Sequence, residues 1–239
     1  MGKNSFFPLF SKYIYNLISD PISIHESTLS VLQDFAADGV VYLELRTTPR
    51  AAGELDREGY IRAVLSAVGE FESSNSSLKT GLILSVDRRD TPSQALETVE
   101  LAIRLKRERE AVVGADLCGD PRREPEGGVK AFEPAFRKAR NAGLGLTIHF
   151  AEAKESSSER ELAEILSWDP DRLGHVICVP EQIKENIRER RKLGLELCLS
   201  CNIKARMVEG GVHDHHFGEW WAWGEERPRI TIAVSTAFY

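Results

Sequence analysis

Two histidines and a glutamate in short apolar runs are the side chains of this sequence best suited to chemistry. His149 and Glu152, three residues apart, close the run Leu144–Glu152, and His175 lies in a second run, Arg172–Ile177. Imidazole and carboxyl groups move protons near neutral pH, and imidazole also binds divalent cations. Such a set suits metal-assisted hydrolysis, in which a cation lowers the pKa of a bound water and neighbouring side chains transfer its protons.

His149 and Glu152 also have a purely structural interpretation. A histidine near the end of a buried strand can be a hydrogen-bonded core residue, and Glu152 begins the polar stretch 152–160. Taken alone, the run favours this structural interpretation, because short motifs match by chance. The choice depends on what the neighbouring elements supply.

Apolar runs alternate with helical patterns along the whole chain. The run that carries His149 is bounded upstream by Asn141-Ala142-Gly143 and is typical of a buried strand. Strict alternation of strand and helix favours a parallel sheet that is closed or curled into a barrel. A complete (β/α)₈ barrel needs eight strands, and the sequence predicts seven, at 40–46, 80–86, 111–117, 144–152, 172–177, 195–200 and 229–234.

Helical patterns fill the intervals between these strands. His25–Asp38 carries apolar residues at helical spacing and should end at Gly39, and the Pro of Thr91-Pro92-Ser93 fits a first helical turn. The segment 6–18 is also apolar and helix-like. Further helices are expected at 57–71, 91–109, 127–142, 159–167, 180–192 and 217–223.

Polar residues gather where the predicted strands end. In a barrel of parallel strands these ends face one common pocket, so the residues should lie near one another. Polarity at strand ends is ordinary in any barrel, which suffices to explain Asp87 and Lys204. The residues at these ends are Glu44, Arg46, Asp87, Arg88, Asp116, Asp120, His149, Glu152, His175, Asn202, Lys204 and Ser235.

The run His213-Asp214-His215-His216 is a second candidate metal site. Adjacent side chains of an extended loop point in different directions, so four polar neighbours rarely bind one ion. A loop that caps the pocket is the favoured interpretation.

Composition excludes several classes of function. Lys and Arg number 31 and Asp and Glu 37, which gives a net charge of −6 without a basic stripe, so nucleic-acid binding is not expected. No run is long enough to span a bilayer, and no signal peptide is evident. The four cysteines suit reduced thiols, and Cys198-Leu-Ser-Cys201 lacks the second pair of a zinc site. We expect a cytoplasmic, monomeric protein with one domain, residues 1–239, and no membrane partner.

Taken in order, several motifs of the chain resemble the adenosine/AMP deaminase family, and in particular its adenosine deaminase-like branch, the N6-methyl-AMP deaminases. The resemblance implies a TIM-type barrel of the metal-dependent hydrolase kind. It implies zinc-dependent hydrolytic deamination of an adenine nucleoside or nucleotide in purine metabolism, acting on adenosine or converting N6-methyl-AMP to IMP. The motifs that carry the resemblance lie at 42–50, 114–120, 149–152, 172–175, 196–202 and 215–218.

The resemblance also assigns roles to individual residues. It implies that His149 binds zinc, that Glu152 protonates a purine ring nitrogen, and that His175 is the base that orients and activates the attacking water. It implies that Gly119 approaches the purine through its backbone, as a residue without Cβ can. Whether the substrate carries a 5′-phosphate stays open, since Arg46, Arg50, Arg88 and Lys204 are all candidates to bind one.

Two departures from the family pattern concern its zinc ligands. The family places a His-x-His pair on its first strand, and no such pair occurs near this N-terminus. After its last strand the family has Asp-Asp, where this chain has Ser235 and Thr236. Of four family ligands only His149 remains, whereas a catalytic zinc site needs about three protein ligands.

These departures predict a barrel that lacks its first strand and the segment after its last strand, truncated at both ends. They also leave two alternatives open. One is an inactive truncated pseudoenzyme or fragment that keeps the fold without zinc. The other is a different amidohydrolase-type chemistry, in which His175 and the run 213–216 form another metal site.

Overall fold

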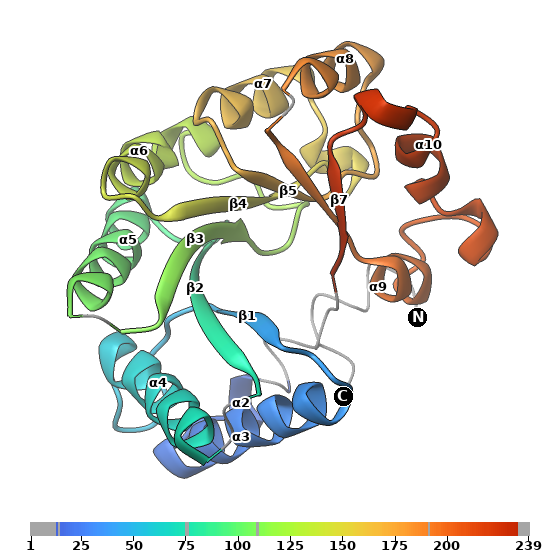
Figure 1. Cartoon of the computed structure of the whole chain (residues 1–239). Coiled ribbons are helices and arrows are strands. Elements are labelled where there is room, and N and C mark those ends of the chain that lie inside the picture. Colours follow the sequence, from blue (N-terminus) through green and yellow to red (C-terminus); the bar gives the residue numbers. More distant parts are fainter. Residues whose placement is uncertain (1–12, 14, 75–76, 109, 191, 234–239) are drawn as a thin grey trace.

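The computed structural model describes residue 13 and residues 15–74, 77–108, 110–190 and 192–233 (Figure 1). Most of the helix expected at 6–18 lies outside these residues, and Tyr15–Leu17 forms a short helix, α2. Ser235 and Thr236 also lie outside the described residues.

Among the described residues, seven parallel strands form one sheet in the order in which they occur along the chain. Each strand pairs with the next one, so the sheet curls into an incomplete barrel with helices around its outside (Figure 1). The expected α/β barrel with seven strands is therefore confirmed. The strands are β1 (Tyr42–Thr47), β2 (Lys79–Asp87), β3 (Val112–Cys118), β4 (Gly145–Phe150), β5 (Arg172–His175), β6 (Gly194–Leu197) and β7 (Arg229–Ile232).

Most helices lie where the sequence predicts them, and some of them begin at side-chain caps. The side chain of Asp20 accepts hydrogen bonds from the backbone N–H groups of Ile22 and Ser23, and Gly39 ends the same helix with φ +81°. Thr91 and Gln94 form a capping box at the start of the helix that begins at Pro92. The helices are α3 (Pro21–Ala37), α4 (Arg57–Ser74), α5 (Pro92–Arg107), α6 (Glu133–Asn141), α7 (Glu159–Ser167), α8 (Glu181–Glu189), α9 (Leu199–Lys204) and α10 (Phe217–Trp221).

Several predicted elements differ from the structure in their bounds, and three of them show a break in a predicted element. The strand expected at 195–200 ends at Leu197, and Leu199 already belongs to α9. The strand expected at 172–177 ends at His175, because His175 and Val176 have φ +66° and +48° and cannot continue a strand. The helix expected at 127–142 is divided into a 3₁₀ turn, η2 (Val129–Phe132), and α6, since Pro134 has no N–H with which to continue a hydrogen-bond ladder.

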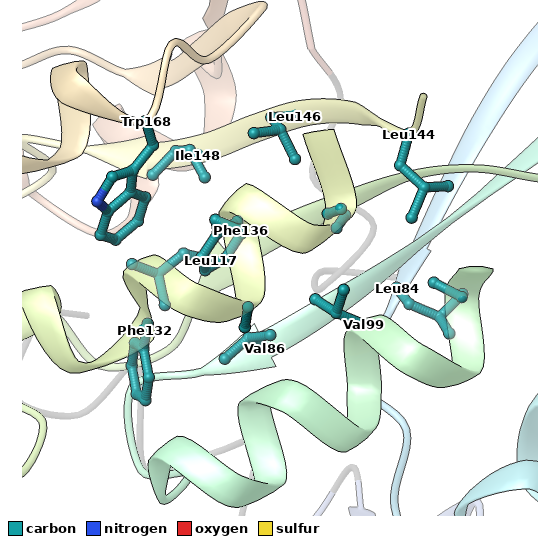
Figure 2. Packing of buried hydrophobic residues seen from close by; sticks show 14 of the residues in the cluster. Leu84, Val86, Val99, Leu117, Phe132, Phe136, Leu144, Leu146, Ile148 and Trp168 are labelled. Carbon is teal, nitrogen blue, oxygen red and sulfur yellow. The ribbon is translucent and has the colours of Figure 1, made fainter. Parts of the chain in front are cut away.

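The main hydrophobic core lies between the sheet and the surrounding helices (Figure 2). Leu146 and Ile148 of β4 are fully buried and face α6, where Phe136 stacks on Trp168 with ring centroids 4.9 Å apart. Burying an aromatic side chain of this kind contributes about 1.5–3 kcal/mol to stability. Because side chains alternate along a strand, this packing turns Thr147 and His149 towards the inside of the barrel.

Within the described residues, no helix combines the length and the apolar composition that crossing a bilayer requires.

Candidate active site

His149 of β4 is paired with Asp116 of the neighbouring strand β3. The register places Asp116 opposite Thr147, so Asp116 and His149 lie close together on the inner face of the sheet. The Nδ1 atom of His149 is 3.0 Å from Oδ1 of Asp116, whose side chain is completely buried and accepts a second hydrogen bond of 3.0 Å from Ser85. The sequence placed Asp116 among the polar strand ends but assigned it no partner.

Asp116 and His149 shift each other's pKa in opposite directions. Burial alone raises the pKa of Asp116, but the positive charges of His149 and Arg46 outweigh burial and lower that pKa below its ordinary value. Burial alone lowers the pKa of His149, and the charge and hydrogen bond of Asp116 raise it above its ordinary value. The buried carboxylate therefore favours the charged form of the His149 ring and holds Nδ1 as the donor.

His175 and Glu152 meet beside this pair, as their positions at strand ends predict. Nε2 of His175 is 3.4 Å from Oε1 of Glu152, and both side chains are buried. The rings of His149 and His175 have centroids 5.2 Å apart. The three residues that the sequence singled out first are thus brought into one cluster.

Burial sets the protonation of Glu152 and His175. It raises the pKa of Glu152 to about 7, although the charges of His149 and Arg88 act in the opposite direction. Burial, followed by the positive charge of His149, lowers the pKa of His175 well below its ordinary value. Near neutral pH the cluster therefore contains a neutral imidazole beside a carboxyl group that is partly protonated.

The main chain around His175 is strained. Ala151, His175 and Val176 have φ of +49°, +66° and +48°, a region that side chains other than glycine rarely adopt. Each such residue costs about 1–3 kcal/mol. Backbone hydrogen bonds offset this strain. The N–H of Val176 donates to the backbone oxygen of Phe150 (3.0 Å), and the N–H of Cys178 donates to that of Ala151 (2.8 Å).

Gly119 fills a place that no side chain can enter. It has φ +109°, and a Cβ atom there would lie 2.8 Å from Oδ1 of Asp87 and 3.0 Å from the backbone nitrogen of Arg88. The glycine therefore allows the end of β3 to approach the loop after β2 closely. This contact accounts for a glycine at 119 by itself, and the approach of its backbone to a purine stays a prediction.

His216 contacts His175 directly and His215 is linked to it through Asn202, whereas His213 is exposed. The His216 ring donates from Nε2 to the backbone oxygen of His175 at 2.6 Å. His215 uses both ring nitrogens in hydrogen bonds, to Asn202 and to the N–H of Phe217. No ring nitrogen of His215 is left for a metal ion, so the alternative metal site at 213–216 has no support here.

Asn202 is the site residue whose function the sequence did not predict. It is fully buried in α9 and lies between His175 and His215, at 2.9 Å from Nδ1 of the first and 3.2 Å from Nε2 of the second. The sequence marked it only as a polar residue near a strand end.

Two of the four candidates for binding a phosphate are engaged in buried ion pairs. Arg46 points into the barrel, where it contacts Glu196 and donates to Thr147 at 3.1 Å. Arg88 is 4% exposed and pairs with Glu161. Arg88 is withdrawn from solvent, whereas 26% of the Arg46 side chain is exposed, and the ion pairs disfavour both guanidinium groups as phosphate ligands.

The donor set of the described residues does not fit a zinc ion. No three of their His, Cys, Asp or Glu side chains are grouped closely enough to hold a metal. Asp116 occupies Nδ1 of His149, so only Nε2 of that ring remains to bind one. A catalytic zinc site needs about three protein ligands.

Comparison with known proteins agrees with the motifs. A family model described as adenosine deaminase matches residues 2–220. N6-Methyl-AMP deaminase-L of Xenopus laevis is 36% identical over 214 residues, which cover 88% of this chain and 60% of that protein. The chain thus spans about 60% of the length of the curated relatives that it matches.

Solved structures agree as well. The crystal structure of Arabidopsis N6-mAMP deaminase superposes with a TM-score of 0.87 at 28% identity, over 99% of this chain and 70% of that one. Arabidopsis ADAL complexed with IMP superposes with a TM-score of 0.85 at 29% identity, over 97% of this chain and 66% of that one.

Proposed function

The chain belongs to the adenosine deaminase family, and from this membership we propose that it carries the site of a hydrolytic purine deaminase. The substrate is an adenine nucleoside or nucleotide, either adenosine or N6-methyl-AMP, the latter converted to IMP with release of methylamine. The names of the relatives and the IMP complex of one of them support the nucleotide. We assign the reaction to purine metabolism in the cytoplasm, and residues 1–239 to a single domain.

The observation that carries this proposal is the pairing of Glu152 with His175. A carboxyl group with a pKa of about 7 retains a proton near neutral pH. It can give that proton to a purine ring nitrogen as C6 becomes tetrahedral, which offsets the charge that develops on the ring. His175, whose Nε2 lies 3.4 Å from Oε1 of Glu152, is the residue that we propose to orient and activate the attacking water. Gly119 contributes its backbone to the purine site.

Zinc is the part of the proposal that the described residues do not support by themselves. We infer that His149 is a ligand through Nε2, and that zinc dependence requires further ligands in addition to the described residues. An inactive protein that keeps the fold without zinc is the alternative function. It is favoured by one observation, the lack of a metal-binding cluster among the described residues.

Metal analysis and an ultraviolet assay separate the two functions. The full chain is incubated with Zn²⁺, freed of excess metal and assayed with N6-methyl-AMP for the absorbance change that accompanies formation of hypoxanthine. A deaminase binds about one equivalent of zinc, and Glu152→Gln lowers its rate about 100-fold or more, as expected on loss of a general acid. Glu97→Gln, an exposed change on α5, serves as the control. A chain without zinc or conversion supports the inactive alternative.

A further inference from the structure

The side chains of His215 and Asn202 form a hydrogen-bonded chain that ends on the ring of His175. We propose that His215 and Asn202 are positioning residues that fix the tautomer of His175, so that its Nε2 atom carries the proton and its Nδ1 atom does not. The inference follows from the direction of each hydrogen bond, beginning at a group whose direction is known.

The first direction is set by the backbone N–H of Phe217. It lies 3.0 Å from Nδ1 of His215, and since a backbone N–H only donates, Nδ1 is the acceptor. Burial, followed by the charge of His216, lowers the pKa of His215 to about 4, which keeps this ring neutral. A neutral ring that accepts at Nδ1 carries its proton on Nε2, and this proton is donated to Oδ1 of Asn202 at 3.2 Å.

The second direction follows from the orientation of the Asn202 amide. Because Oδ1 accepts from His215, the NH₂ group is turned towards His175, where Nδ2 lies 2.9 Å from Nδ1. An amide NH₂ only donates, so Nδ1 of His175 is an acceptor without a proton. The ring proton of His175 is therefore on Nε2, which faces Oε1 of Glu152 at 3.4 Å.

The neighbouring His216 holds the main chain of the same residue. Its Nε2 donates to the backbone oxygen of His175 at 2.6 Å, and its ring stacks on His215 with centroids 4.1 Å apart. We call His215 and His216 the histidine clasp. The clasp acts on the ring of His175 through Asn202 and on its strained backbone directly, so ring and main chain are fixed together.

The fixed tautomer limits what His175 does in the deaminase, a consequence that rests on the proposed function. With its proton on Nε2, the ring is a donor, either to Oε1 of Glu152 or to the oxygen of a water that takes its place. Nε2 cannot remove a proton from water while it carries its own. Orienting the water is the part of the role proposed above that agrees with this tautomer.

Nitrogen chemical shifts test the tautomer without metal or substrate. The full chain is labelled with ¹⁵N-histidine, treated with a chelator and studied near neutral pH by two-bond ¹H–¹⁵N correlation, and His175→Gln assigns the signals. We expect a neutral ring with Nε2–H at His175. A wild-type spectrum with Nδ1–H, or with a proton on both nitrogens, overturns the proposal.

Asn202→Asp provides the decisive variant, since a carboxylate cannot donate to Nδ1. We expect Nδ1 of His175 to become protonated, while the exposed change Asn186→Asp on α8 leaves the tautomer as in the wild type. An unprotonated Nδ1 in Asn202→Asp contradicts the proposal. If that variant does not fold, the wild-type spectrum still decides, and His215→Leu should yield a mixture of tautomers. If the chain is inactive but gives the expected spectrum, the proposed function is wrong and the tautomer assignment still holds.

Discussion

Nδ1 of His149 lies 3.0 Å from Oδ1 of Asp116, a carboxylate that is completely buried. Ser85 donates a hydrogen bond to the second oxygen, and a guanidinium nitrogen of Arg46 lies 3.9 Å from the first. The carboxylate therefore lies beside the positive charge of Arg46 and holds Nδ1 of His149 as a donor, which leaves Nε2 as the nitrogen of His149 that can bind a ligand. The pair therefore affects both the stability of the barrel and the geometry of the candidate site.

Asp116→Asn should destabilise the protein strongly. The amide keeps the shape of the side chain but removes the charge, which leaves His149 and Arg46 without their shared counter-ion. Breaking a buried ion pair in this way costs about 3–5 kcal/mol, measured as the free energy of unfolding in urea. The exposed Asp34→Asn on α3 should change it by less than about 0.5 kcal/mol. An Asp116→Asn protein as stable as this control would show that the pair does not act as an ionic unit.

Gly119→Ala should be destabilising, whereas Gly69→Ala should be stabilising. At Gly119 the new Cβ meets Asp87 at 2.8 Å in a backbone with φ +109°, so strain of about 1–3 kcal/mol is expected. At Gly69, inside α4, a Cβ meets nothing within 4 Å, and replacing a helical glycine contributes about 0.5–1 kcal/mol. Thermal unfolding of the two variants should move in opposite directions, and equal shifts would refute the steric explanation.

The sequence predicted the strands well because an apolar run between helical patterns is a strong signal, as for Leu146 and Ile148. It predicted the ends of strands less well. The sequence pattern predicts His175 inside a strand, but the strand ends there because His175 has a positive φ. This turn depends on hydrogen bonds that Val176 and Cys178 donate to Phe150 and Ala151, which lie far earlier in the chain. Side-chain types do not encode such a turn.

In the candidate site, too, the sequence predicted some residues and missed the roles of others. His149, Glu152 and His175 were found because imidazole and carboxyl groups at strand ends are rare combinations with known chemistry. Asn202 and His215 acquire their positions only when the segment after β6 folds back onto β5, and 13 residues separate them. Their spacing has no helical or strand period, so no sequence pattern predicts the contact.

His215 should make the protein less stable in acid. Its pKa is about 4 in the folded chain and about 6.5 in an unfolded one, so the unfolded state binds the proton more readily. The contribution is fully present above pH about 6.5 and is lost as the pH falls towards 4, by at most about 3 kcal/mol. Relative to the wild type, His215→Gln should gain stability in urea unfolding curves as the pH falls from about 6.5 to 4, whereas the exposed His213→Gln should follow the wild type. The same slope in both variants would assign the effect to other groups.

Glu152 should act with the opposite sign over nearly the same pH range. Its folded pKa is about 7, above the value of about 4.5 for an unfolded glutamate, so the folded state binds the proton more readily. The contribution is fully present below pH about 4.5 and is lost as the pH rises through 7, on the order of 3 kcal/mol. In the wild type the slopes from Glu152 and His215 oppose each other, so each is measured as the difference in stability between a variant and the wild type. Relative to the wild type and to Glu97→Gln, Glu152→Gln should therefore gain stability as the pH rises from 4.5 to 7. A constant difference across that range would show that burial does not hold the proton on Glu152, and would remove the physical basis for its role as the acid.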